Sequence, residues 1–297
     1  MSLRVAVVQA GSILFDTERT LAKAESWAAE AGRAGAQLIV FPEAFIGGYP
    51  KGLDFGARVG SRTPEGRKQF RCYSESAIDV PGPATARLGE AARAVSAWMV
   101  IGVIERSSTG TLYCTALFFA PDGSLAARHR KVMPTAMERL IWGFGDGSTL
   151  PVIETGFGKV GAAICWENYM PLLRTALYAK GIQFYCAPTV DDRDTWSISM
   201  RHIALEGRCF VISACQYVPD LIRGGSVIVN PAGTILAGPN RDGECLLTAD
   251  LDPGEIAEGK YDLDVAGHYG RPDIFHLEVN ESSADVARFH TNRDSPD

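Results

Sequence analysis

The sequence predicts an α/β fold in which two mixed sheets stack between outer helices, a four-layer α-β-β-α sandwich with internal pseudo-symmetry. Short apolar, β-branched runs alternate with helical segments, and this order occurs twice along the chain. Each half then closes with a hairpin, which adds antiparallel strands to a parallel core. Periodicity alone also leaves open a single sheet with helices on both faces.

The first half begins with a strand at residues 3–10, the apolar run LRVAVVQA. Asp16 can cap the helix that follows, because a carboxylate accepts hydrogen bonds from the free N–H groups of a first helical turn. The apolar face of this helix carries Leu21, Ala24, Ala28 and Ala31, and Gly32 and Gly35 end it. The remaining elements of this half are a strand at 37–41, a helix near 84–97, a strand at 98–104 and a hairpin around the turn 121–124.

The second half repeats this order. Residues 159–165 form a strand, and Pro171 lies where the first turn of a helix accepts proline. The elements that follow are a strand at 182–187, a helix near 195–206, a strand at 209–215 and a hairpin around the turn 231–234. No linker separates the halves, so we expect one domain over residues 1–280 and a polar tail at 281–297. Residues 52–76, rich in charge and glycine, predict a surface excursion with a functional or interfacial role.

Composition narrows the class of protein. A chain of 297 residues with 46% hydrophobic and 22% charged residues is typical of a soluble globular protein, and its net charge of −6 argues against nucleic acid or an anionic membrane as partner. The N-terminal apolar run breaks at Gln9, which favours a core strand over a secretory signal. Seven cysteines without regular spacing favour reduced thiols in the cytoplasm. No CxxC or HExxH spacing occurs, so no metal site is predicted.

Four candidate catalytic residues lie at or near strand ends, where reactive groups gather in α/β proteins. Glu43 follows the strand at 37–41, Cys165 ends the strand that opens the second half, and Lys131 ends the first hairpin, with Glu138 seven residues later. A thiol with an ordinary pKa of about 8.5 is only a few per cent thiolate at neutral pH, so it needs a base. A carboxylate can take that proton, and a lysine can stabilise negative charge that develops on a substrate.

Each of these residues also has a structural alternative. Cys165 could be a packing residue, Glu43 a turn cap and Lys131 a solvated surface charge, and Glu138 could lie on a helix surface. The rival nucleophile is Cys186, but the Ala-Pro that follows it offers no donors. The joint placement of the glutamate, lysine and cysteine is therefore what predicts a catalytic site.

Three long motifs, FPEAFIGGYPKG, HRKVMPTAMERLIWGFGDG and ICWENYMPLLR, give the chain its resemblance to the nitrilase superfamily of carbon–nitrogen hydrolases. The resemblance extends from VAVVQA to GHYGRPD, nearly the whole chain. It implies the α-β-β-α sandwich and a triad in which Glu43 is the general base, Lys131 the lysine and Cys165 the nucleophile. It also implies that Glu138 is an additional structural or catalytic glutamate.

The resemblance also points to the true nitrilase branch. Trp166 and Glu167 follow the nucleophile, with Trp142 in ERLIWGFGDG, whereas amidase branches tend to have tyrosine or glycine and then aspartate. The implied reaction converts a nitrile into a carboxylic acid and ammonia through a thioimidate and a thioester on Cys165. The Trp166 N–H is the expected donor to the developing charge. No cofactor is expected, because the nucleophile and the proton donors are all protein groups.

Five residues near the strand ends are candidates for the substrate pocket: Tyr49, Thr135, Trp142, Trp166 and Thr189. Aromatic walls would favour aryl or arylalkyl nitriles. The stretch YAKGIQFYCAPT resembles plant-type nitrilases that accept cyano-amino acids, so the substrate stays open. His202, in SMRHIALEG, is interpreted as a histidine between helix and core.

Several alternatives remain at this stage. The chain could be an amidase or another C–N hydrolase of the same fold, or an enzyme that stops at the amide. It could be a non-catalytic binding protein, or a redox sensor that pairs Cys165 with Cys186. A homo-oligomer, a dimer or larger, is expected through the helix after Cys165 and the helix that carries Trp196 and Met200. The loop after Tyr217 and the C-terminal tail are short for the family, which leaves the size of the assembly open.

Overall fold

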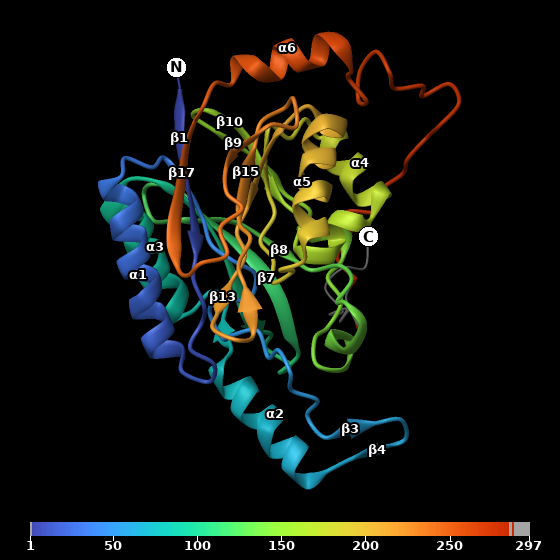
Figure 1. The fold of residues 1–297 in the computed structure, drawn as a ribbon. Coiled ribbons are helices and arrows are strands. Elements are labelled where there is room, and N and C mark those ends of the chain that lie inside the picture. The colour runs from blue at the N-terminus through green and yellow to red at the C-terminus, as the bar shows by residue number, and fades with distance from the viewer. Residues whose placement is uncertain (1, 285–286, 288–297) are drawn as a thin grey trace, which may run out of the picture.

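The structure, a computed structural model, describes residues 2–284 and residue 287 and has four layers. Helices α1 (Thr17–Arg33) and α3 (Pro83–Val95) lie on one outer side, and α4 (Pro171–Ala179) and α5 (Asp194–Gly207) lie on the other. Figure 1 shows the two sheets between these helix pairs. The predicted α-β-β-α sandwich is thus confirmed.

The first sheet is mixed, with the strand order β17-β1-β2-β6-β7-β8 and a short β5 beside β6. The strands β1, β2 and β6 pair in parallel, and β17, β7 and β8 add antiparallel pairs. Their bounds are β1 Leu3–Gln9, β2 Leu38–Val40, β5 Ile78–Asp79, β6 Trp98–Arg106, β7 Leu112–Phe119, β8 Leu125–Arg130 and β17 Cys245–Leu251.

The second sheet repeats this pattern, with the order β16-β15-β12-β11-β10-β9. Here β10, β11 and β12 are parallel, and β9, β15 and β16 pair antiparallel at the two sides. The strands are β9 Val152–Thr155, β10 Gly158–Ala162, β11 Phe184–Cys186, β12 Phe210–Ser213, β15 Val227–Val229 and β16 Ile235–Ala237. The same pairing in both halves is the pseudo-symmetry that the sequence predicts.

Two glutamines show how closely the halves correspond. The backbone N–H of Gln37 donates to the carbonyl of Arg4, and its side-chain oxygen accepts from the Arg4 N–H. Gln183 makes the same two bonds with Lys159. Each glutamine therefore holds the start of one parallel strand beside its neighbour, β2 beside β1 and β11 beside β10.

The strands have two buried faces, which explains their nearly continuous apolar sequences. Along β1, Val5 and Val7 belong to the core between the two sheets. Ala6, between them, belongs to the core under α1 and α3. In β11, Phe184 faces the central core, and Tyr185 belongs to the core under α4 and α5. The alternation places three apolar cores between four layers.

Local sequence signals set where the helices begin. The Asp16 carboxylate accepts from the Arg19 N–H at the start of α1, as expected for a cap. Pro171 is the first residue of α4, where its missing N–H leaves no helical bond unmade. The sandwich is completed by α6 (Gly254–Asp262), which crosses one end in Figure 1.

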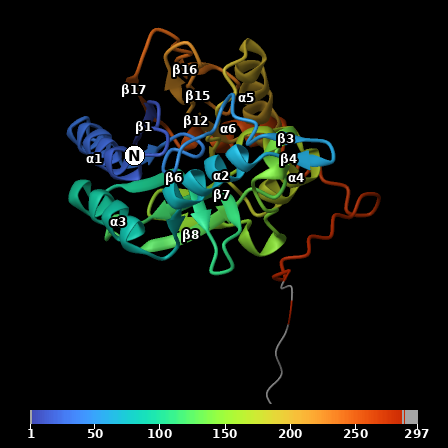
Figure 2. The same cartoon turned by 90° about the horizontal axis from the view of Figure 1, so that it is seen from below.

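The excursion at residues 52–76 leaves the opposite end of the sandwich. It contains the hairpin of β3 (Ala57–Arg58) and β4 (Ser61–Arg62) and then α2 (Pro64–Ser76). Figure 1 shows it projecting from the layers, and in Figure 2, seen from below, α2 lies across the middle of the view. The short loop after Tyr217 belongs to a second small hairpin, which pairs β13 (Tyr217–Val218) with β14 (Ile222–Arg223). Most of the predicted tail at 281–297 lies outside the described residues.

One interpretation of α5 is wrong. The His202 side chain is 65% exposed and lies 3.7 Å from Glu206, so this histidine is on the outer face of the helix and not against the core. Trp196 and Met200, the residues that marked this helix for the expected contact between chains, are fully buried against the second sheet, and the contact through this helix stays a prediction. The outer face of α5 carries Ile198 instead. The apolar runs of the sequence did not distinguish the two faces, because both carry large apolar side chains.

Within the described part of the chain, none of the helices has the length and apolar character needed to cross a membrane.

Candidate active site

Glu43 follows β2 at the carboxyl end of the first sheet, and its side chain is fully buried. The next residue, Ala44, has a φ of 50°, which turns the chain sharply. A Cβ on Gly102 of β6 would lie 2.7 Å from the Glu43 Cα and 2.3 Å from the Pro42 carbonyl oxygen. A glycine at position 102 is therefore what allows this turn to approach the sheet.

Lys131 follows β8 directly and reaches two carboxylates. Its Nζ lies 2.7 Å from Glu43 Oε1 and 2.7 Å from Glu138 Oε2. Burial lowers the pKa of Lys131, but the neighbouring carboxylates, Glu43 first, outweigh burial and hold the pKa well above its usual range. Lys131 is therefore an ammonium at the centre of the site.

Glu138 lies in the 3-10 turn Ala136–Leu140, and it is buried rather than on a helix surface. Besides Lys131, it accepts from the Thr135 N–H at 2.6 Å and from the Tyr49 hydroxyl at 2.8 Å. Burial, with Glu138 beside it, raises the pKa of Tyr49, so its hydroxyl stays protonated and donates. These bonds fix the glutamate against Lys131.

Cys165 lies at the start of the 3-10 turn Cys165–Tyr169. The preceding strand β10 ends at Ala162, so Cys165 is three residues beyond the strand and not its last residue, as the sequence had predicted. Its φ of 51° is a left-handed conformation that costs roughly 1–2 kcal/mol for a residue with a Cβ. Its N–H donates to the Pro188 carbonyl, and its own carbonyl accepts from the Asn168 side chain at 2.7 Å.

The surroundings of Cys165 determine its protonation. Burial raises the pKa of the thiol, the negative charge of Glu43 raises it further, and Lys131 opposes the shift. The Thr189 hydroxyl donates to the sulfur at 3.2 Å. Burial also raises the pKa of Glu43, which makes it a stronger base than an ordinary glutamate. The resting sulfur thus holds its proton beside a carboxylate suited to accept it.

The two oxygens of Glu43 have different partners. Oε1 accepts from Lys131 and, at 3.6 Å, from the thiol of Cys114. Oε2 is buried and makes no hydrogen bond with the residues that the structure describes. Oε2 is therefore the oxygen of Glu43 that is free to accept a proton. Gln216 donates to the Glu43 carbonyl at 2.8 Å and fixes the backbone behind the carboxylate.

A buried glutamate–lysine–cysteine set on an α-β-β-α sandwich agrees with what comparison with known proteins finds. The family model for carbon–nitrogen hydrolases matches residues 4–261. The chain belongs to the carbon–nitrogen hydrolase family. An aliphatic nitrilase of Sinorhizobium fredii is 56% identical to this hydrolase over 305 residues, covering 96% of this chain and 98% of that protein.

Two further relatives agree with this assignment. A bifunctional nitrilase/nitrile hydratase of Nicotiana tabacum is 55% identical to the hydrolase over 310 residues, covering 97% of this chain and 89% of that protein. A solved structure from Saccharomyces cerevisiae, a member of branch 10 of the nitrilase superfamily, has a TM-score of 0.72 and 26% identity over 91% of this chain and 97% of that one. The identities to curated nitrilases place the hydrolase in the nitrilase branch.

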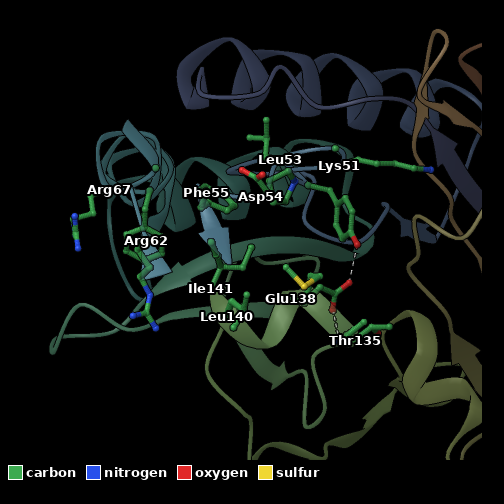
Figure 3. Close-up of a pocket in the computed structure, with 18 residues that line it drawn as sticks. Lys51, Leu53, Asp54, Phe55, Arg62, Arg67, Thr135, Glu138, Leu140 and Ile141 are labelled. Atoms are coloured by element: carbon green, nitrogen blue, oxygen red, sulfur yellow. Dashed lines mark hydrogen bonds between the residues drawn. The ribbon is translucent and has the colours of Figure 1, made fainter. Parts of the chain in front are cut away.

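A pocket of about 590 Å³ opens beside the buried set of the hydrolase (Figure 3). Tyr49, Thr135 and Glu138 form its inner end, and the dashed bonds in Figure 3 join the two flanking residues to the glutamate. Its walls come from the excursion at 52–76 and from the turn after Thr135, and include Leu53, Phe55, Phe70, Met137, Leu140 and Ile141. The excursion that breaks the repeat therefore forms one wall of the pocket.

The other three pocket candidates lie around this space and do not line it. The Trp142 ring is 5.7 Å from the Tyr49 ring and 5.6 Å from Lys131 Nζ, and its N–H donates to the Tyr73 hydroxyl. The Thr189 hydroxyl donates to the Cys165 sulfur. Trp166 is half-exposed, and its N–H donates to Asp191 at 2.9 Å.

Sequence reasoning missed several residues that contact the site. Cys114 and Gln216 bond to Glu43, and His129 pairs with Glu167. In the sequence, Glu167 was used only to distinguish the nitrilase branch from the amidase branches. The signals were present but weak: His129 lies two residues before the lysine, and Gln216 directly follows a buried strand. The rival Cys186 is fully buried, and burial alone raises its pKa. No group of three or more His, Cys, Asp or Glu side chains in the described residues could hold a metal ion.

Proposed function

We propose that this hydrolase is a nitrilase that converts an organic nitrile into the carboxylic acid and ammonia, with Cys165 as nucleophile, Glu43 as base and Lys131 as the group that stabilises the substrate nitrogen. The observation that carries the proposal is Lys131, which is buried and lies 2.7 Å from each of two carboxylates. A cation fixed in this way costs no reorganisation when negative charge develops on the nitrogen.

In the first half of the reaction, Glu43 accepts the Cys165 proton and the sulfur attacks the nitrile carbon. One C–N π bond breaks as the C–S bond forms, and the nitrogen takes a proton from Lys131, which gives a thioimidate. The Trp166 N–H supports this step, because it lies in the first turn of a 3-10 helix, where N–H groups lack partners within the helix.

In the second half, Glu43 first passes the proton it took from Cys165 to Lys131, whose Nζ lies 2.7 Å from its Oε1, so that both groups recover their resting charges. Glu43 then removes a proton from water, and the hydroxide adds to the thioimidate carbon. The tetrahedral intermediate holds sulfur, nitrogen and oxygen on one carbon. Protonation of the nitrogen expels ammonia and leaves a thioester, which a second water hydrolyses to the acid and free Cys165. Glu138 acts through Lys131, which it holds together with the Thr135 N–H and the Tyr49 hydroxyl.

The shape of the pocket supports arylalkyl and longer aliphatic nitriles as substrates. Its walls are mainly apolar, with Glu138 and Thr135 at one end and the charged Arg62 and Arg67 toward the other (Figure 3). Mainly apolar walls with a few polar groups bind a ligand that has an apolar body, and the end at Glu138 is the one suited to its reacting group. Tyr49 and Thr135 are the substrate-side residues that line this space, while Trp142, Trp166 and Thr189 act from behind or beside it.

The amide is a second candidate product. The tetrahedral intermediate yields an amide when sulfur leaves in place of ammonia. The tobacco relative is named as a bifunctional nitrilase/nitrile hydratase, which favours release of some amide by this chain as well.

The test is a panel of aromatic, arylacetic and aliphatic nitriles and β-cyanoalanine, with ammonia, acid and amide measured for the wild type and the Cys165→Ala variant. The proposal is supported if the wild type forms acid and ammonia and the Cys165→Ala variant forms neither. No turnover of any nitrile, with ammonia released from the matching amides, would make the protein an amidase.

We also propose that residues 1–280 form a single domain that acts in the cytoplasm as a homo-oligomer. The free thiols support a reducing compartment. Large apolar side chains on the outer faces of α4 and α5, Leu172 and Ile198, are 68% and 65% exposed, which supports a contact between chains at this face.

A further inference from the structure

A buried ion pair lies behind the two catalytic segments. His129 and Glu167 have no exposed side-chain surface, and His129 Nε2 is 2.8 Å from Glu167 Oε2. The other ring nitrogen, Nδ1, lies 2.5 Å from the Thr149 carbonyl oxygen. Because both nitrogens face acceptor oxygens, the ring carries both protons and His129 is a cation.

The protonation of His129 agrees with its surroundings. Burial alone lowers the pKa of this histidine, but the Glu167 carboxylate outweighs burial, so the pKa is raised. The two side chains therefore form a paired imidazolium and carboxylate inside the protein.

Glu167 also holds two backbone groups. Its Oε1 accepts from the Val132 N–H at 2.6 Å, and its Oε2 accepts from the Ile164 N–H at 2.7 Å. Val132 directly follows Lys131, and Ile164 directly precedes Cys165. One carboxylate thus ties the backbone beside the lysine to the backbone beside the nucleophile, although the two segments come from different sheets.

We propose that the His129–Glu167 pair positions Lys131 relative to Cys165 and thereby sets the ratio of acid to amide among the products. This proposal rests on the proposed nitrilase function. It concerns the tetrahedral intermediate, in which one carbon bears the Cys165 sulfur, an amino group and a hydroxyl.

The ratio depends on which bond of that intermediate breaks. When Lys131 gives its proton to the amino nitrogen, the C–N bond breaks, ammonia leaves and the thioester continues to acid. When that proton is poorly placed, the C–S bond breaks, the thiolate takes back its proton and the amide leaves. A displaced lysine therefore favours amide, while binding of the nitrile itself changes little.

The direct test is Glu167→Gln. A glutamine offers one acceptor oxygen where the carboxylate serves two backbone N–H groups and the imidazolium, so one segment is released. We expect kcat to fall on the order of 10- to 100-fold, the loss typical of a misplaced catalytic group. We expect the amide fraction to rise several-fold with KM nearly unchanged, using phenylacetonitrile or the panel nitrile that the wild type hydrolyses fastest.

A second variant, His129→Asn, leaves the two backbone bonds of Glu167 in place and removes the cation that holds its carboxylate. Compared with Glu167→Gln, this variant should fold more readily and should raise the amide fraction by a smaller factor. This variant keeps the test decisive if Glu167→Gln does not fold.

The matched control is Glu105→Gln. Glu105 is also buried and also bonds to cations, the side chains of Arg128 and Arg130, but it contacts no backbone group of the two catalytic segments. A loss of thermal stability in this variant without a change in product ratio would show that general destabilisation does not produce amide.

An unchanged product ratio in folded Glu167→Gln and His129→Asn would overturn the positioning role, whatever happens to kcat. The same rise in amide in Glu105→Gln would overturn it too. Wild-type enzyme that turns over no nitrile would instead refute the nitrilase function itself, and this proposal with it.

Discussion

At the residue scale, the site is a balance between two carboxylates, one ammonium and one thiol, all of them buried. Lys131 stays charged because its partners are fixed, and Glu43 is a stronger base than usual because it is buried. Cys165 keeps its proton until a substrate arrives, because burial, and then the negative charge of Glu43 beside it, raise the pKa of its thiol.

This balance predicts the acid limb of the pH profile. Because the pKa of Glu43 is raised, the carboxylate becomes protonated, and can no longer accept the Cys165 proton, at a pH above the usual glutamate value of about 4.3. Measured as kcat/KM against pH, activity should fall on acidification with a midpoint above that value. Full activity down to about pH 4 would exclude a base with a raised pKa.

The strained backbone at Cys165 leads to a stability prediction. Cys165 has a φ of 51°, a conformation that glycine adopts without the steric cost of a Cβ. Among inactive variants, Cys165→Gly should therefore be more stable than Cys165→Ala by about 1 kcal/mol. Thermal unfolding of the two proteins checks this. Equal stability, or a more stable alanine variant, would show that the turn relaxes when the sulfur is removed.

Chemical type and position at strand ends were enough to predict that Glu43, Lys131 and Cys165 lie together, while their catalytic roles stay a prediction. The same reasoning could not predict Cys114, whose thiol reaches Glu43 across 71 positions of sequence. That contact depends on the register of β6 and β7, which periodicity does not specify. His202 was misplaced for a related reason, because helical spacing does not say which of two apolar faces is buried.

At the element scale, the strands act as supports that bring distant turns to one end of the sandwich. Glu43, Lys131 and Cys165 follow β2, β8 and β10, and each belongs to an irregular segment after the strand. The sequence predicted these strands well because both faces are buried, which produces continuous apolar runs. It did not predict that β10 would stop three residues before Cys165, because the apolar run continues through Ile164.

The close approach of β6 to the Glu43 turn can be tested with Gly102→Ala. The added Cβ would lie 2.3 Å from the Pro42 carbonyl oxygen and 2.5 Å from the Ala44 nitrogen, both backbone atoms. Overpacking of this kind costs roughly 1–3 kcal/mol of stability. We expect that loss in chemical unfolding, together with a fall in kcat, because the turn must move away from Lys131.

Gly156→Ala is the control for this change, since nothing lies within 4 Å of the Cβ it would add. If Gly102→Ala were as stable and active as Gly156→Ala, the turn would not depend on close contact with the sheet.

At the scale of the whole molecule, each of the repeated halves contributes side chains to the site. The first half supplies Glu43 and Lys131, and the second supplies Cys165. Buried side chains cross between the halves: Gln216 reaches the Glu43 carbonyl, and Gln9 accepts from the N–H groups of Gly225 and Ser226. The repeat itself could be predicted from the sequence, whereas these cross-links could not, because they depend on how the sheets stack.

The exposed apolar face of α4 and α5 predicts association. A double variant, Leu172→Asp with Ile198→Asp, should reduce the particle mass measured by light scattering after gel filtration, because two charges would be buried in the contact. Leu236→Asp, an exposed leucine on β16, is the control and should leave the mass unchanged. A wild type with the mass of one chain would contradict association, and an unaffected double variant would place the contact elsewhere.

The central claim is that Cys165 carries the substrate as a covalent intermediate. The most direct test is to quench the enzyme in acid during turnover of a nitrile and to measure the mass of its peptides. The account predicts the acyl group of that nitrile on the peptide that contains Cys165, and no adduct on Cys165→Ala. Turnover without an adduct on this peptide, or an adduct on Cys186 in its place, would contradict the account.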